Sequence, residues 1–177
     1  MSNNMKSDFC ITHFFNPVRF MRLLEIVETP SINAKKIVGL KEFCKNKLGK
    51  GIVNCNDTPG FIGNRIGVYA MQVAMYEALD RGLPIEITDA LFGRPLGIPK
   101  TGVFGLYDLI GIDLMKDVLS SFKKELQEED PFMEVVRPHP IVEKLLDKGY
   151  YGNKGPGGFY EITTVEGNEI IKALNTS

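Results

Sequence analysis

Short apolar runs alternate with one helical pattern in the first third of the chain. Residues 9–15 and 23–28 are apolar enough for buried strands, and the first run stops before a proline, which cannot donate to a strand ladder. Thr29-Pro30 then supplies a helix cap followed by proline at the first helical position. Apolar residues recur at helical spacing up to a glycine, and residues 51–55 form a third apolar run. This order predicts a parallel strand–helix–strand crossover.

The pattern changes at Thr58-Pro59, which repeats the cap-plus-proline start and opens a helical region. The first helix is expected to end near residue 81, before Gly82, which makes it about 35 Å long. Its small residues lie three or four positions apart and form a narrow face for close packing: Gly60, Gly63, Gly67, Ala70, Ala74 and Ala78. Further helices are expected over residues 85–92, over 104–127 with a break near Gly111 and a cap at Asp113, and over 139–148. A glycine-rich loop and an extended end follow.

Composition and charge exclude several classes of function. The 177 residues carry a formal net charge of -1, which gives no sign of a nucleic-acid or anionic-membrane partner. With two histidines, and three cysteines that lack ligand spacing, the sequence predicts no metal site, and the cysteines are interpreted as reduced thiols. The start shows no apolar signal-peptide core, and no run is long enough to span a bilayer. A cytoplasmic protein is therefore expected.

His13 and Glu25 each interrupt an apolar run, where a charge without a partner would be costly. The simplest solution is that they partner each other, so that a carboxylate orients an imidazole acting as a general base. His13 also stands at the carboxyl end of a predicted strand, where open α/β sheets place their ligands. Two plainer interpretations stay open: His13 could bond a backbone carbonyl, and Glu25 could be a solvated residue of an edge strand.

Asn64 lies in the first turns of the long predicted helix. It is either an ordinary polar residue near a helix start or a hydrogen-bond donor aimed at a carbonyl, assisted by the positive helix terminus. Two glycine-rich stretches carry less information. GRPLGIPKT lacks the Gly-Lys-Thr adjacency of a P-loop, and GNKGPGG does not lie between a strand and a helix, so both are expected to be loops.

Four stretches together resemble the NAD-dependent 3-hydroxyacyl-CoA dehydrogenases of fatty-acid β-oxidation: HFFNPV (13–18), LLEIV (23–27), DTPGFIGNRI (57–66) and GNKGPGGFY (152–160). Their order and intervals fit that family from about residue 9 to residue 160. The resemblance implies the last βαβ part of a Rossmann-type domain in residues 1–57. It implies a helical carboxyl-terminal dimerisation domain in residues 58–177. Another dehydrogenase of similar two-domain plan is an alternative that the combination of motifs disfavours.

The resemblance also implies roles for five residues. His13 resembles the base that takes the proton of the 3-hydroxyl group of an acyl-CoA while hydride passes to NAD, and Glu25 resembles its orienting carboxylate. Asn64 resembles the asparagine that positions the acyl thioester. Asn16 and Lys154 match family positions that reach toward the cofactor or the substrate. The helical part is expected to form a homodimer and to cover the acyl chain.

The start of the chain departs from the family pattern. The strand, G-x-G-x-x-G turn and helix on which NAD lies in the family have no counterpart here, nor does a substrate-binding serine, so we expect a truncated chain that is inactive alone. Two hypotheses follow. In the first, a separate polypeptide supplies the NAD site, and His13, Glu25 and Asn64 converge in one pocket. In the second, the chain is a non-catalytic dimerisation and acyl-binding fragment in which His13 and Glu25 do not meet.

Overall fold

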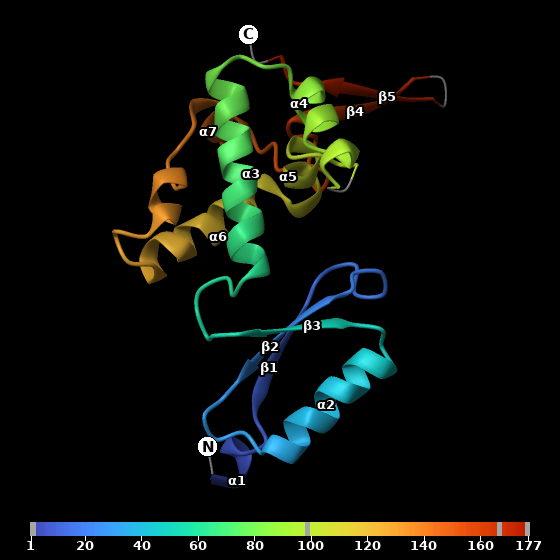
Figure 1. Ribbon diagram of the computed structural model, residues 1–177. Helices are drawn as coiled ribbons and strands as arrows, with labels where there is room; N and C mark the ends of the chain where they lie inside the picture. The colour runs from blue at the N-terminus through green and yellow to red at the C-terminus, as the bar shows by residue number, and fades with distance from the viewer. Residues whose placement is uncertain (1–2, 98–99, 166–167, 176–177) are drawn as a thin grey trace. The chain divides into compact units, whose positions relative to one another are not determined.

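The chain folds as two units, Met1–Ile66 and Gly67–Ser177. The structure, a computed structural model, describes residues 3–97, 100–165 and 168–175. The first unit contains a three-stranded sheet and its covering helix, and the second contains a group of helices and a two-stranded hairpin (Figure 1). Helix α3 (Gly63–Asp80) begins in the first unit and continues into the second.

The sheet of the first unit has the strand order β1-β2-β3. A short helix, α1 (Asn3–Lys6), precedes β1 (Cys10–Phe14), which pairs antiparallel with β2 (Leu23–Glu28). Helix α2 (Ala34–Asn46) then leads to β3 (Gly51–Cys55), which pairs parallel with β2. The predicted parallel strand–helix–strand crossover is therefore confirmed.

The side chains of β2 divide between the two faces of the sheet. Leu24 and Ile26 are completely buried and pack against Ile37 and Cys44 of α2, which lies along one face (Figure 1). Because side chains alternate along a strand, Glu25 points to the opposite face. A slip of one residue would turn Glu25 toward α2, so the apolar contacts under this helix specify the register that the site needs.

Two predicted helix starts are wrong, for reasons that lie in neighbouring hydrogen bonds. Helix α2 begins at Ala34, where the Asn33 side chain accepts from two backbone N–H groups. Thr29 instead donates its hydroxyl to the Phe9 carbonyl at 3.1 Å. Helix α3 begins at Gly63, five residues after Thr58, because the intervening residues form a turn.

The helices of the second unit follow the predicted order. After α3 come α4 (Ile85–Leu91), α5 (Phe104–Ile110), α6 (Ile112–Glu125) and α7 (Pro140–Asp147), with short 3-10 helices at Arg94–Leu96 and Pro131–Val135. The predicted break lies at Gly111, whose φ of 106° favours glycine. The predicted cap at Asp113 is wrong, because Gly111 holds the cap position and the Asp113 carboxylate pairs with Lys154.

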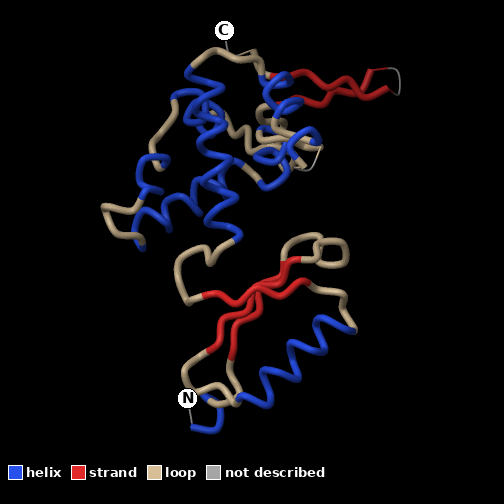
Figure 2. Tube along the Cα trace, viewed as in Figure 1, coloured by secondary structure: helices blue, strands red, loops and turns tan. Residues whose placement is uncertain are grey.

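The chain ends in a hairpin of β4 (Tyr160–Val165) and β5 (Asn168–Ala173), which extends away from the helices of its unit (Figure 2). The sequence predicts only an extended end here. The strands pair antiparallel in a register that places Ile162 opposite Ile171, and both side chains are exposed.

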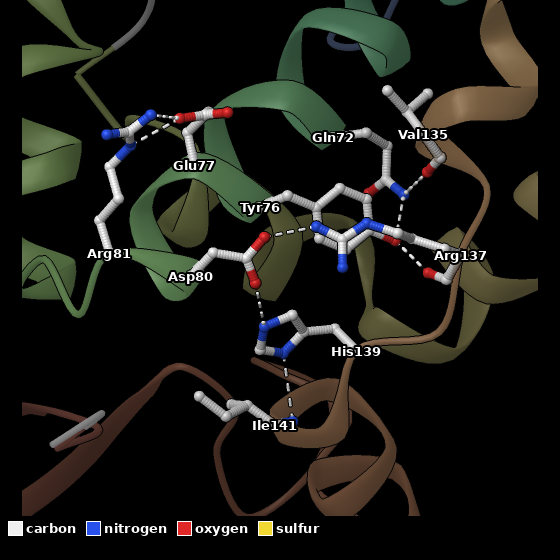
Figure 3. Close-up of polar contacts among 9 residues, drawn as sticks. All are labelled: Gln72, Tyr76, Glu77, Asp80, Arg81, Val135, Arg137, His139 and Ile141. Carbon is white, nitrogen blue, oxygen red and sulfur yellow. Dashed lines mark hydrogen bonds and ion pairs between the residues drawn. The ribbon is translucent and has the colours of Figure 1, made fainter.

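A buried polar network ties α3 to the segment before α7 (Figure 3). Gln72 is fully buried, donates to the Val135 carbonyl at 2.9 Å and accepts from the Tyr107 hydroxyl. The Tyr76 hydroxyl donates to the Arg137 carbonyl. Because these buried groups find partners within the unit, the helices pack without the penalty of unmet hydrogen bonds.

The network ends in a small charged cluster at the end of α3. The Arg137 guanidinium lies 4.1 Å from the centre of the Tyr76 ring and pairs with Asp80. The Asp80 carboxylate also lies 3.4 Å from Nε2 of His139, whose Nδ1 accepts from the Ile141 N–H and so caps α7 (Figure 3). His139, the second histidine of the chain, thus has a structural role.

Candidate active site

His13 and Glu25 meet on the sheet face opposite α2. They are direct cross-strand partners in the β1–β2 register, and His13 Nδ1 lies 2.7 Å from Glu25 Oε2. The carboxylate side chain is 1% exposed and the imidazole is 30% exposed. The pairing that the sequence predicts is therefore present, and the interpretation of Glu25 as a solvated edge residue is wrong.

The second carboxylate oxygen of Glu25 is held by the chain segment that starts α3. The backbone N–H groups of Ile62 and Gly63 donate to Oε1 at 2.9 and 2.6 Å, and the Cys55 thiol lies 3.7 Å from the same oxygen. Burial acts to raise the pKa of Glu25, but the hydrogen bonds from Gly63, His13 and Ile62 outweigh it and hold the pKa below its usual range. Glu25 is thus a fixed anion beside the imidazole.

Two aromatic rings flank the imidazole of His13. The Phe15 ring stands edge-on with its centre 4.7 Å away, and the Phe61 ring is tilted with its centre 5.6 Å away. Together with the Glu25 contact they restrict the ring's rotation. Among the described residues Nε2 has no hydrogen-bond partner, so this nitrogen is available to exchange a proton.

The two asparagines of the predicted site lie near this dyad in the chain and are exposed. Asn64 follows Gly63 directly in the first turn of α3. Asn16 comes two residues after β1 and is joined to Pro17 by a cis peptide bond. No side-chain hydrogen bond of either amide is found within the described part of the chain, so their predicted roles stay predictions.

Lys154 belongs to the second unit, in the glycine-rich loop that precedes β4. Its ammonium group lies 2.5 Å from Asp113 Oδ1, and this contact holds the pKa of Asp113 below its usual range. The loop is closed by a bond from Gly152 N–H to the Gly157 carbonyl at 2.8 Å. The structure does not bring Lys154 together with the dyad in one unit, and its cofactor role stays a prediction.

Sequence reasoning missed Lys50, which supports the loop after β1. The residue is 8% exposed, and its ammonium group donates to the backbone carbonyls of Val18 and of Met21, the latter at 2.7 Å. It also lies 5.7 Å from the centre of the Phe14 ring. Nothing in the sequence distinguishes Lys50 from the exposed lysines around it, because burial here depends on how the loop folds back.

Comparison with known proteins identifies the family. A family model described as "3-hydroxyacyl-CoA dehydrogenase, C-terminal domain" matches residues 60–162, and one described as "3-hydroxyacyl-CoA dehydrogenase, NAD binding domain" matches residues 1–58. The chain belongs to the 3-hydroxyacyl-CoA dehydrogenase family. The domain boundary that the sequence predicts, between residues 57 and 58, stays a prediction.

Several relatives are longer than this chain. A putative fatty acid oxidation complex trifunctional enzyme of Rickettsia prowazekii is 40% identical over 177 residues, which are 100% of this chain and 25% of that protein. The mitochondrial hydroxyacyl-coenzyme A dehydrogenase of Sus scrofa is 37% identical, over 86% of this chain and 47% of its own length. The chain thus spans between a quarter and half of these relatives.

Solved structures agree with this assignment. The 3-hydroxybutyryl-CoA dehydrogenase of Escherichia coli K12 aligns with a TM-score of 0.70 at 30% identity, over 88% of this chain and 32% of that one. The (S)-3-hydroxybutyryl-CoA dehydrogenase of Ralstonia eutropha aligns with a TM-score of 0.67 at 28% identity, over 86% and 51%. Within the described residues, no helix is long and apolar enough to cross a bilayer, and no cluster of three or more His, Cys, Asp or Glu residues could hold a metal.

Proposed function

We propose that the chain carries the proton-transferring dyad of an NAD-dependent 3-hydroxyacyl-CoA dehydrogenase of fatty-acid oxidation. The observation that carries this proposal is the 2.7 Å contact between His13 Nδ1 and the buried Glu25 carboxylate in a chain of this family. The names of the relatives, which include a fatty acid oxidation complex enzyme, support an acyl-CoA substrate.

In this proposal His13 acts as the base through Nε2. Glu25 accepts from Nδ1–H, which selects the neutral tautomer whose Nε2 carries a lone pair. When Nε2 takes the proton of the 3-hydroxyl group, the imidazolium stands beside a carboxylate that is already ionised, and this attraction stabilises the charged product of the transfer. Glu25 need not move or change its charge during the reaction.

NAD is the family's cofactor and accepts hydride in the family's reaction, but the described residues do not fit its pyrophosphate. The junction between β2 and α2 has the sequence TPSIN, without the glycines that let a backbone approach a pyrophosphate, and the 177 residues contain no G-x-G-x-x-G. Asn16 and Lys154 are proposed contacts only. The chemistry assigned to this chain is therefore the proton transfer alone.

The proposed partners are an acyl-CoA substrate and a second copy of the chain. Part of the small-residue face of α3 supports a homodimer, because Gly67 and Ala70 are exposed. Ala74 and Ala78, by contrast, are buried within their own unit. A separate chain that carries the NAD-binding part is the further proposed partner. A non-catalytic dimerisation and acyl-binding fragment is the alternative, and the meeting of His13 with Glu25 argues against it.

The test is a fusion that joins the amino-terminal portion of the Sus scrofa relative to this chain. The fusion is assayed by oxidation of NADH with acetoacetyl-CoA. The chain alone is expected to be inactive in this assay. His13→Gln should lower turnover by about 10²–10⁴-fold, since it removes the proton-transferring group. His139→Asn is the matched control, because it changes the other histidine and keeps a side chain that can cap α7. Full turnover in His13→Gln would contradict the proposal.

A further inference from the structure

Phe61 has a backbone conformation that phenylalanine rarely adopts. Its φ is +47°, and no other non-glycine residue in the described part of the chain has a positive φ. The preceding residues form a turn in which Phe61 N–H donates to the Thr58 carbonyl at 3.0 Å, with Pro59 and then Gly60 (φ 72°) at the central positions of a type II turn. The turn is complete at Gly60, so its geometry does not itself require Phe61 to be left-handed.

The left-handed step lies immediately before the two N–H groups that hold Glu25. Both Ile62 N–H and Gly63 N–H donate to the same carboxylate oxygen, at 2.9 and 2.6 Å. A left-handed residue directly ahead of two such amides is one way for the backbone to form an anion-binding concavity. The Phe61 ring meanwhile lies beside His13, with its centre 5.6 Å from the imidazole centre.

We propose that Phe61 is a positioning residue whose left-handed backbone directs the Ile62 and Gly63 N–H groups onto Glu25 and thereby fixes the orientation of His13. The proposal rests on the proposed function, because it assigns a role in supporting the dyad. Backbone strain that persists beside a functional group is retained when the surroundings over-determine it. Here the carboxylate on one side and the imidazole on the other supply that support.

Two substitutions separate the backbone from the ring. Phe61→Gly and Phe61→Val both remove the aromatic ring, but glycine adopts positive φ freely whereas a β-branched residue is strongly disfavoured there. The 177-residue chain, labelled with ¹³C and ¹⁵N, is followed by amide hydrogen exchange at Ile62 and Gly63 and by titration of the Glu25 carboxyl carbon. Phe61→Gly should keep slow exchange and the lowered pKa of Glu25. Phe61→Val should speed exchange at both amides by about tenfold or more and move the pKa of Glu25 upward.

Phe20→Val is the control, because Phe20 is a 75% exposed phenylalanine of the loop after β1 and should leave both readouts unchanged. If Phe61→Val does not fold, Phe61→Ala replaces it, since alanine also resists positive φ without branching. Equal behaviour of the glycine and valine variants would overturn the proposal, whether both keep the contacts or both lose them. These readouts need no turnover, so failure of the His13→Gln test would reject the proposed function and leave this result standing.

Discussion

Asp108 is a buried carboxylate that holds two backbone N–H groups of a distant segment. It lies in α5, is 2% exposed, and accepts from Phe159 N–H at 2.9 Å and from Tyr160 N–H at 2.8 Å. It thereby anchors the end of the glycine-rich loop that carries Lys154. Burial raises the pKa of Asp108 to about 6, although the two backbone bonds oppose this, and the nearby carboxylate of Asp89 adds to the rise.

The sign and size of the pH effect follow from this pKa. A carboxyl whose pKa is higher in the folded chain than the ordinary 3.8 binds its proton more tightly there, so it stabilises the fold at low pH. The contribution is complete below about pH 4 and is lost as the pH rises to about 6 and above. A difference of roughly two pKa units corresponds to about 3 kcal/mol in the free energy of unfolding.

Asp108→Asn isolates this effect. The two N–H groups bond different oxygens of Asp108, and the asparagine replaces one of these oxygens with an NH2 group. One N–H group therefore loses its acceptor, which imposes a cost that does not depend on pH. Denaturant unfolding of both proteins is measured from pH 4 to pH 8 by circular dichroism, since the chain has no tryptophan. The stability advantage of the wild type over the variant should shrink by about 2 kcal/mol between pH 4 and pH 7, since part of the effect is already lost at pH 4. An advantage that stays constant across this range would show that the pKa of Asp108 is not raised in the folded chain.

Three further predictions concern stability. Lys50→Met should lower the free energy of unfolding by about 1–3 kcal/mol and speed amide exchange in the loop after β1, because two carbonyls lose a charged donor; unchanged exchange there would argue against its supporting role. The lowered pKa of Glu25 stabilises the fold above about pH 4.5, and this stabilisation is lost as the pH falls through the pKa of Glu25 in the folded chain. Glu25→Gln should therefore remove this part of the loss of stability in acid. Denaturation at pH 3–6 checks this, and identical pH curves would rule it out. A Cβ at Gly152, whose φ is 90°, would lie 2.4 Å from a backbone oxygen of α5, whereas a Cβ at Gly149 would meet nothing within 4 Å. Gly152→Ala should therefore lower the melting temperature far more than Gly149→Ala, and equal losses would contradict the close approach.

The sequence predicts the dyad because burial makes it expensive to leave either member alone. His13 and Glu25 interrupt apolar runs, and the cost of an unpartnered charge leads to their pairing before any geometry is known. The order of the helices can be predicted in the same way, since helices end next to Gly82 and at Gly111 in the structure. These features depend on local pattern and on burial.

The features that sequence reasoning missed depend on which of several competing contacts forms in the folded chain. Thr29 is a good helix cap, but its hydroxyl donates to the Phe9 carbonyl just before β1, and Asn33 caps α2 instead. The positive φ of Phe61 cannot be inferred from a residue type that usually avoids it. Lys50 looks like a surface lysine until the loop after β1 turns its carbonyls toward it. In each case the outcome is set by tertiary contacts.

The role of His13 as the base is tested most directly by its tautomer, measured by ¹⁵N NMR on the 177-residue chain at a pH where the ring is neutral. The second histidine, His139, serves as an internal reference, because its Nδ1 accepts from a backbone N–H and its neutral ring therefore carries the proton on Nε2. His13 is expected to adopt the opposite tautomer, with the proton on Nδ1 facing Glu25 and a lone pair on Nε2. A His13 ring with its proton on Nε2 would contradict the assignment of this histidine as the base.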